Sequence, residues 1–298
     1  MTKVIATLGA IGACWVLGSG EVRACATCGC GDPTLTAVGN ELPFAGRARL
    51  GLSFGYETSE SGMAGRDLQR VAQTRLEASF SYAPARWLSF GITLPLVHRE
   101  IDQVNLAHDT VSGTGDAEAY AKAYLYRDRA FAPHHLVAVS GGLRAPTAPE
   151  RALADGQPMD VDLQTGTGSW TPLVGLSYTY LRAVWSFYGG AIAGGPTGGF
   201  GTYRPGSYVR GTVLAQLQPQ ESYALRLGID ARDEAPGEQE GMPIPDTGGL
   251  IAFASPGFAY SPLPDMLLVL EVRVPLLERL DGYQKEGPVF GLSAAYDL

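Results

Sequence analysis

Residues 70–82 read RVAQTRLEASFSY and alternate in character from Gln73 onward. The positions form two sets, an apolar one of Leu76, Ala78, Phe80 and Tyr82 and a polar one of Gln73, Arg75, Glu77, Ser79 and Ser81. Successive side chains of a β-strand point to opposite sides, so this pattern predicts a strand between an apolar and a polar environment. The stretch is also long enough to cross a bilayer as a tilted strand, which takes about 9 to 11 residues.

Eleven further stretches show similar alternation: Arg47–Tyr56, Leu88–His98, Asp116–Tyr126, His135–Arg144, Trp170–Tyr180, Trp185–Ala193, Tyr208–Leu217, Tyr223–Arg232, Leu250–Tyr260, Met266–Leu276 and Val289–Leu298. The resulting total of about twelve is even, as in single-chain bacterial barrels. We therefore predict an all-β fold, a transmembrane antiparallel up-and-down β-barrel of about 12 strands over residues 45–298. A soluble β-sandwich would explain the alternation equally well.

Loop lengths and aromatic positions favour the barrel over the sandwich. Short turns at 84–86, 182–183, 219–221 and 262–265 alternate with longer polar loops, although the connection at 127–134 is longer than its siblings. Short periplasmic turns and long extracellular loops are typical of outer-membrane barrels. Aromatic residues gather at the turn side as an interfacial girdle, namely Tyr82, Tyr178, Tyr180, Trp185, Tyr223, Tyr260 and Tyr296. Both termini are thus expected in the periplasm.

The N-terminus predicts export. Lys3 precedes an uncharged, mostly apolar run over 4–17, and a small residue precedes Cys25, which indicates a signal peptide over 1–24. A retained membrane anchor and lipidation of Cys25 or Cys14 are the alternatives. After this segment no apolar run approaches the about 20 residues of a membrane helix. Charged residues make up only 17% of the chain, below the roughly one quarter usual in soluble domains. We expect the outer membrane of a Gram-negative bacterium.

We expect residues 25–44 to form a periplasmic segment or a plug, and they hold three cysteines within six residues. Cys25, Cys28 and Cys30 could bind Cu(I) or Zn(II) through thiolates, with His134 or His135 as a further ligand. Alternatively, two of the cysteines form a disulfide in the oxidising periplasm and the third is free or acylated.

The polar strand faces predict a charged lumen. The lining would hold Arg47, Arg49, Arg75, Glu77, Lys122, Arg144, Arg210, Arg226, Asp230, Arg232, Glu271 and Arg273, together with Asp116 and Glu118. Nine of these are basic and five acidic, which predicts a net positive lining of about four charges. The extracellular loops, in which Glu57 is predicted to lie, are acidic instead. Such a lining could favour anions, or its charges could simply pair across a filled lumen.

Several short segments resemble a family of Gram-negative outer-membrane proteins. The matching segments are Gly113–Asp116, the hairpin from Ser81 to Val97, Leu143–Thr147 and Gly166–Pro172. This family is described as transporters or is named after the phenol-degradation meta pathway. The resemblance covers roughly 45–298 and implies an outer-membrane barrel loosely related to hydrophobic-substrate channels.

Together these features predict a channel or transporter-like barrel that passes small solutes, hydrophobic or anionic. The alternative is a structural or binding barrel whose cysteines bind a metal or dock a periplasmic redox partner. We expect no enzyme, since no Ser-His-Asp set is evident. The expected partners are the lipid bilayer, lipopolysaccharide, a small-molecule solute and the outer-membrane assembly machinery, which the alternating C-terminal strand would engage; no nucleic acid is expected.

Overall fold

The computed structural model describes residues 45–103, 108–130, 132–151 and 163–298. The predictions for the signal peptide (1–24) and for the segment 25–44 with Cys25, Cys28 and Cys30 lie outside these residues. The described strands are β1 (Ala48–Ser61), β2 (Gln69–Ala85), β3 (Leu88–Gln103), β4 (His108–Thr114), β5 (Ala117–Arg127), β6 (His135–Ala145), β7 (Thr171–Arg182), β8 (Trp185–Gly194), β9 (Tyr203–Arg204), β10 (Tyr208–Gln220), β11 (Tyr223–Glu234), β12 (Glu238–Gln239), β13 (Met242–Pro243), β14 (Gly249–Leu263), β15 (Met266–Leu280), β16 (Gln284–Glu286) and β17 (Val289–Asp297).

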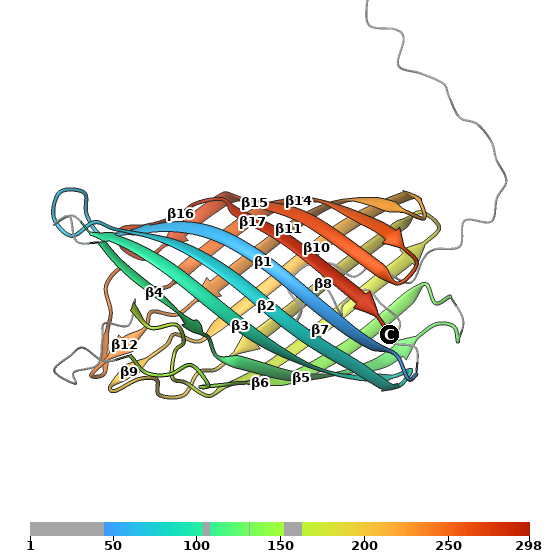
Figure 1. Ribbon diagram of the computed structural model, residues 1–298, viewed down its shortest axis with the longest axis horizontal. Helices are drawn as coiled ribbons and strands as arrows, with labels where there is room; N and C mark the ends of the chain where they lie inside the picture. Colours follow the sequence, from blue (N-terminus) through green and yellow to red (C-terminus); the bar gives the residue numbers. More distant parts are fainter. Residues whose placement is uncertain (1–44, 104–107, 131, 152–162) are drawn as a thin grey trace, which may run out of the picture.

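The main sheet closes on itself, as Figure 1 shows. The twelve long strands pair antiparallel in sequence order, and β1 pairs with both β2 and the last strand, β17. The short strands β4 and β16 continue the lines of the longer strands β5 and β17 that follow them. Both β4 and β5 pair with β3, and both β16 and β17 pair with β1. The predicted antiparallel barrel of twelve strands is thereby confirmed. A closed barrel leaves no backbone edge unpaired, which a sheet in hydrocarbon requires.

The two ends of the barrel differ. Short connections after β2, β5, β7, β10 and β14 lie at one end, called the turn end here, together with the C-terminus (Figure 1). Longer connections lie at the other, the loop end, where β9, β12 and β13 form a small sheet of their own. Within the described residues, no helix is long and apolar enough to span a membrane.

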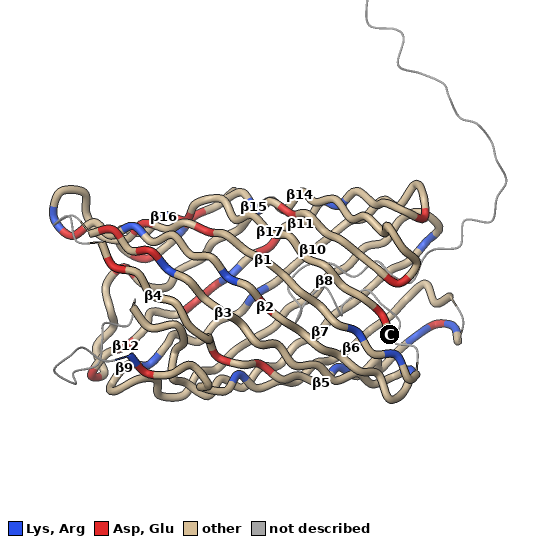
Figure 2. The backbone as a smooth tube through the Cα atoms, in the orientation of Figure 1, with Lys and Arg blue, Asp and Glu red and all other residues tan. Residues whose placement is uncertain are grey.

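The outside of the barrel is apolar. Val213 and Leu176 are 66% and 58% exposed, whereas their neighbours Leu214 and Ser177 are 3% and 9% exposed, so alternate residues face out and in. Charged residues also occur along the strands (Figure 2), and they belong to the inward-facing set because the outward positions are apolar. An apolar exterior around a polar interior is the pattern of a transmembrane barrel.

Aromatic side chains form a row on the outer face near the turn end. His135 on β6 stacks with Tyr178 on β7, their ring centroids 6.1 Å apart, and lies 5.0 Å from Tyr180. The row continues onto β8, where Phe187 lies 6.3 Å from Tyr180 and 6.0 Å from Trp185. Such amphipathic rings are favoured at the level of lipid headgroups.

The strands run further toward the loop end than the sequence predicted. In the structure β1 continues to Ser61 and β3 to Gln103, and β4 forms where the sequence predicted only a loop. Polar pairs stabilise these extensions, as between Arg70 and Glu60 at 2.8 Å. The prediction stopped too early because the apolar–polar alternation ends where the strands leave the apolar belt, while the backbone pairing continues.

Candidate functional site

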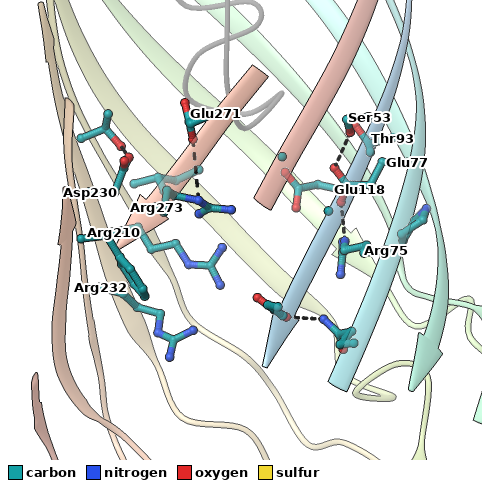
Figure 3. A pocket seen from close by; sticks show the side chains of 18 of the residues that line it. Ser53, Arg75, Glu77, Thr93, Glu118, Arg210, Asp230, Arg232, Glu271 and Arg273 are labelled. Carbon is teal, nitrogen blue, oxygen red and sulfur yellow. Dashed lines mark hydrogen bonds and ion pairs between the residues drawn. The ribbon is translucent and has the colours of Figure 1, made fainter. Parts of the chain in front are cut away.

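A cavity of about 580 Å³ lies inside the barrel (Figure 3). Strands from around the barrel contribute to its wall, and its lining is mostly polar and charged. Of the fourteen charged residues predicted in the lumen, eleven line this cavity: Arg75, Glu77, Asp116, Glu118, Arg144, Arg210, Arg226, Asp230, Arg232, Glu271 and Arg273.

The three remaining predicted residues lie outside the cavity lining. Arg47 and Arg49, near the start of β1, form ion pairs with Asp297 at the end of β17. Lys122 on β5 is 4% exposed, and its Nζ atom lies 5.4 Å from the ring centroid of Tyr124. These residues face inward, but they lie nearer the turn end than the cavity does.

The barrel interior near the turn end contains large buried side chains. Tyr124 on β5, Leu136 on β6 and Tyr188 on β8 are all buried, and each lies within a few residues of a turn. A glycine on the same strand makes room for one of these rings: a Cβ atom at Gly190 would collide with the Tyr188 ring. Access through the barrel is therefore narrower near the turn end than in the cavity.

The cavity lining is nearly balanced in charge, whereas the sequence predicted a surplus of about four positive charges for the lumen as a whole. Seven basic residues, Arg75, Arg99, Arg144, Arg210, Arg226, Arg232 and Arg273, face six acidic ones, Glu57, Glu77, Asp116, Glu118, Asp230 and Glu271. Two of these were missed because β1 and β3 run further than predicted. The sequence predicts Glu57 in an extracellular loop, and Arg99 follows the predicted end of the third strand at His98.

Ion pairs and hydrogen bonds hold most of the acidic groups on the wall formed by β1 to β6. Arg75 Nε lies 2.5 Å from Glu77, which also accepts a hydrogen bond from Ser53 Oγ at 3.4 Å. Arg144 Nη2 lies 3.1 Å from Glu118 across two adjacent strands. Figure 3 shows Glu77 and Glu118 on the same side of the cavity.

The opposite wall, formed by β10 to β15, holds a second charged group. Glu271 lies between two cations, at 3.6 Å from Arg226 Nη1 and 3.7 Å from Arg273 Nε. Arg232 Nη2 lies 2.9 Å from Glu286. In Figure 3, Arg210, Arg232 and Arg273 point from this side toward the middle of the cavity.

Two carboxylates in the lining bind neutral donors. Asp230 accepts hydrogen bonds from the hydroxyl groups of Thr212, at 2.6 Å, and of Ser255. Asp116 accepts hydrogen bonds from the backbone N–H groups of Ala148 and Thr167, which anchors the long connection between β6 and β7 at the cavity mouth. Sequence periodicity places these acids in the lumen but cannot show which donors they meet.

The three cysteines of the predicted metal site, Cys25, Cys28 and Cys30, lie outside the described residues. Among the described residues, no three His, Cys, Asp or Glu side chains lie close enough together to hold a metal ion. His134 and His135 lie at the turn end, as the sequence predicted, where the Oδ1 atom of Asp128 accepts hydrogen bonds from both of their backbone N–H groups.

Comparison with known proteins supports the fold. No family model matches the chain, and no curated protein matches its sequence. The chain is similar to the solved structure of an outer-membrane channel from Pseudomonas putida F1, with a TM-score of 0.67 at 14% identity over 86% of this chain and 96% of that one. At this identity the likeness shows a shared fold, that of an outer-membrane β-barrel.

Two other solved structures show weaker similarity. One is a mutant of TodX, a monoaromatic hydrocarbon channel, with a TM-score of 0.48 at 10% identity over 86% of this chain and 90% of that one. The other is a FadL homologue from Pseudomonas aeruginosa, with a TM-score of 0.45 at 13% identity over 93% of this chain and 97% of that one.

Proposed function

We propose that this protein is an outer-membrane channel that passes small solutes through its barrel, with the turn end in the periplasm. The observation that carries the proposal is a polar, charged cavity of about 580 Å³ enclosed by strands whose outer faces are apolar. A barrel that only anchored another protein would have no need of a solvated cavity lined by thirteen charged side chains. The fold shared with an outer-membrane channel from Pseudomonas putida F1 supports the proposal.

The route proposed for the solute runs from the loop end through the cavity and past the buried tyrosines near the turn end. The cavity presents both charged groups and apolar side chains such as Leu173, Ile192 and Phe253. Small organic molecules bind in clefts of this size that combine apolar walls with a few polar groups. We include membership of the transporter family named above in this proposal, on the strength of the sequence resemblance.

The alternative, a barrel that docks a metal or a redox partner through Cys25, Cys28 and Cys30, stays a prediction from the sequence. No contact within the described residues favours it over transport. Metal analysis of the purified protein, compared with a variant in which all three cysteines are serine, would test it.

A blocking variant tests the channel. Gly55 on β1 and Gly291 on β17 line the cavity, and a Cβ atom at either position would meet no heavy atom closer than 3.8 Å. Gly55→Trp with Gly291→Trp should therefore fill the cavity without straining the wall. The control is Val213→Trp, at an outward position.

Liposome swelling with small sugars, amino acids and organic acids gives the readout. We expect influx with the wild-type protein and with the Val213→Trp variant, and strongly reduced influx with the doubly blocked variant. Equal influx in all three would show that solutes do not cross through the cavity.

A further inference from the structure

Arg210 on β10 differs from the other cations of the cavity wall. Among the described residues it makes no ion pair or hydrogen bond, whereas Arg226 and Arg232 each pair with a carboxylate. Its Nε atom is buried without a hydrogen-bond partner, as are those of Arg226 and Arg232. Its one close polar contact is with the ring of Tyr208, whose centroid lies 4.9 Å from the guanidinium carbon. A buried charged donor without an acceptor is costly, so such a group calls for a functional explanation.

The register of β10 and β11 adds to this cost. Arg210 lies directly opposite Arg232, and like charges in that position destabilise a sheet. Arg232 is neutralised by Glu286 at 2.9 Å and Glu234 at 3.5 Å. Arg210 has no carboxylate at ion-pair distance within the described chain. The cavity has seven basic and six acidic residues, which leaves one positive charge in excess. Of the seven basic residues, Arg210 is the one whose charge is least compensated.

A second guanidinium approaches the same aromatic ring. Arg144 on β6 lies 5.9 Å from the centroid of Tyr208, so two cations converge on one tyrosine. Gly194 makes this possible: a Cβ atom there would lie 2.5 Å from the Tyr208 ring, so only glycine lets the ring lie across β8. Cation–π contacts orient a guanidinium without consuming its hydrogen-bond donors.

Apolar side chains complete the surroundings of Arg210. Leu173 on β7, Ile192 on β8 and Tyr208 form one buried cluster, and Ile192 is the partner of Arg210 across the strand pair. Leu173, Ile192 and Tyr208 also line the cavity. A guanidinium with free donors therefore lies beside a compact apolar wall.

We propose that these five residues, Arg144, Leu173, Ile192, Tyr208 and Arg210, form a binding subsite for an organic monocarboxylate with a compact apolar body, such as an aromatic acid. The carboxylate accepts hydrogen bonds from Arg210 and the body packs on Leu173 and Ile192. Arg144 is already paired with Glu118 at 3.1 Å, so it supports the positive potential while Arg210 supplies the donors. This inference rests on the proposed function, since it names the solute class that the channel prefers.

Equilibrium binding to the full-length protein in detergent tests the subsite without requiring conduction. The probe is benzoate, and benzyl alcohol supplies a similar body without the charge. We expect benzoate to bind more tightly than benzyl alcohol, and Arg210→Gln to weaken benzoate binding by about tenfold or more, the range for a lost hydrogen bond to a charged group. Arg210→Lys should retain part of the affinity. The control is Arg204→Gln, in the exposed loop sheet.

Thermal stability separates a binding role from a structural one. Arg210→Gln removes an uncompensated charge opposite Arg232, so its melting temperature should equal or exceed that of the wild type while benzoate binding falls. A lower melting temperature with unchanged binding would assign Arg210 to the scaffold and overturn the subsite.

Transport assays on the same variants distinguish the two proposals. The subsite would be rejected, and the channel kept, by two results together. The wild-type protein would admit benzoate and benzyl alcohol equally, and Arg210→Gln would change neither the ratio of their fluxes nor benzoate binding. Specific benzoate binding without any solute flux would reject the channel and keep the binding site. If chloride competed as well as benzoate, the site would be a general anion filter, and the organic class would be wrong.

Discussion

Arg49 and Asp297 join the first and last strands of the barrel. The Nε and Nη2 atoms of Arg49 donate hydrogen bonds of 2.7 and 2.6 Å to the two carboxylate oxygens of Asp297. Arg47 adds a second contact of 2.5 Å to the same carboxylate. The pair lies at the seam where β1 meets β17, one residue from the C-terminus, and both side chains are less than 10% exposed.

Asp297→Asn should therefore destabilise the closed barrel. The change leaves two guanidinium groups without their carboxylate, and removing one partner of a buried ion pair costs about 3 kcal/mol or more. Urea unfolding of the refolded protein in detergent would measure the loss. Asp265→Asn, in the exposed β14–β15 turn, is the matched control and should change the free energy of unfolding little. Equal stability of both variants would contradict a role of the seam.

Leu292→Arg tests whether the outer face meets lipid. Leu292 is 52% exposed near the middle of β17, beside Phe54 and Leu270 on the neighbouring strands. Arginine on the lipid face near the bilayer midplane costs about 2–4 kcal/mol. We expect slower and less complete folding into vesicles, while Leu292→Phe should fold normally. Normal folding of the arginine variant into vesicles would argue against a membrane-facing surface there.

Tyr124→Ala combined with Tyr188→Ala should widen the narrow part of the barrel near the turn end. Both rings are buried inside the barrel, so their removal opens space along the proposed route. We expect larger solute flux and a higher size limit in liposome swelling. Tyr260→Ala, on the outer face, is the control and should leave the flux unchanged. A double variant with wild-type flux would place the limiting constriction elsewhere.

The turn between β5 and β6 should loosen at low pH. The backbone N–H of His135 is the largest cause that lowers the pKa of Asp128, with a further contribution from that of His134 and opposition from desolvation. Because the pKa is lower in the folded state, the stabilisation is complete above the unfolded value of about 3.9 and is lost as the pH falls through the folded value.

Amide hydrogen exchange checks this turn. Protection of the His134 and His135 amides should decrease as acidification protonates Asp128, while strand amides such as that of Val137 keep theirs. In Asp128→Asn, which cannot titrate, the protection should no longer follow this acid transition. If the protection of the His134 and His135 amides in the wild type did not change with pH across the acidic range, this result would contradict their hydrogen bonds to Asp128.

The strands and their two faces could be read from the sequence because a period of two is a local property. The same property placed Arg75, Arg210 and Glu271 on inward faces. It could not show that Arg226 reaches Glu271 across β14, because such a contact depends on strand tilt and on the three-dimensional arrangement of the lumen. Asp297 shares the inward face with Ser293 and Ala295, yet its role appears only once β17 closes against β1.

The Arg210 subsite shows the same limit. The sequence allows Tyr208 and Arg210 to be assigned to one face of their strand. The approach of Arg144 on β6 to the Tyr208 ring depends on Gly194, which lies two strands away on β8 and leaves room for that ring. The near balance of charge in the cavity likewise follows from the position of Arg47, Arg49 and Lys122, which face inward but lie outside the cavity lining.

Planar-bilayer recording tests the channel most directly. The protein should produce discrete conductance steps, and Gly55→Trp with Gly291→Trp should reduce them strongly while Val213→Trp leaves them unchanged. Recording should be repeated on protein lacking residues 25–44, the segment expected to lie in the periplasm or act as a plug. The absence of conductance in both the full-length and the shortened protein, or steps of equal size in the doubly blocked variant, would contradict transport through the barrel cavity.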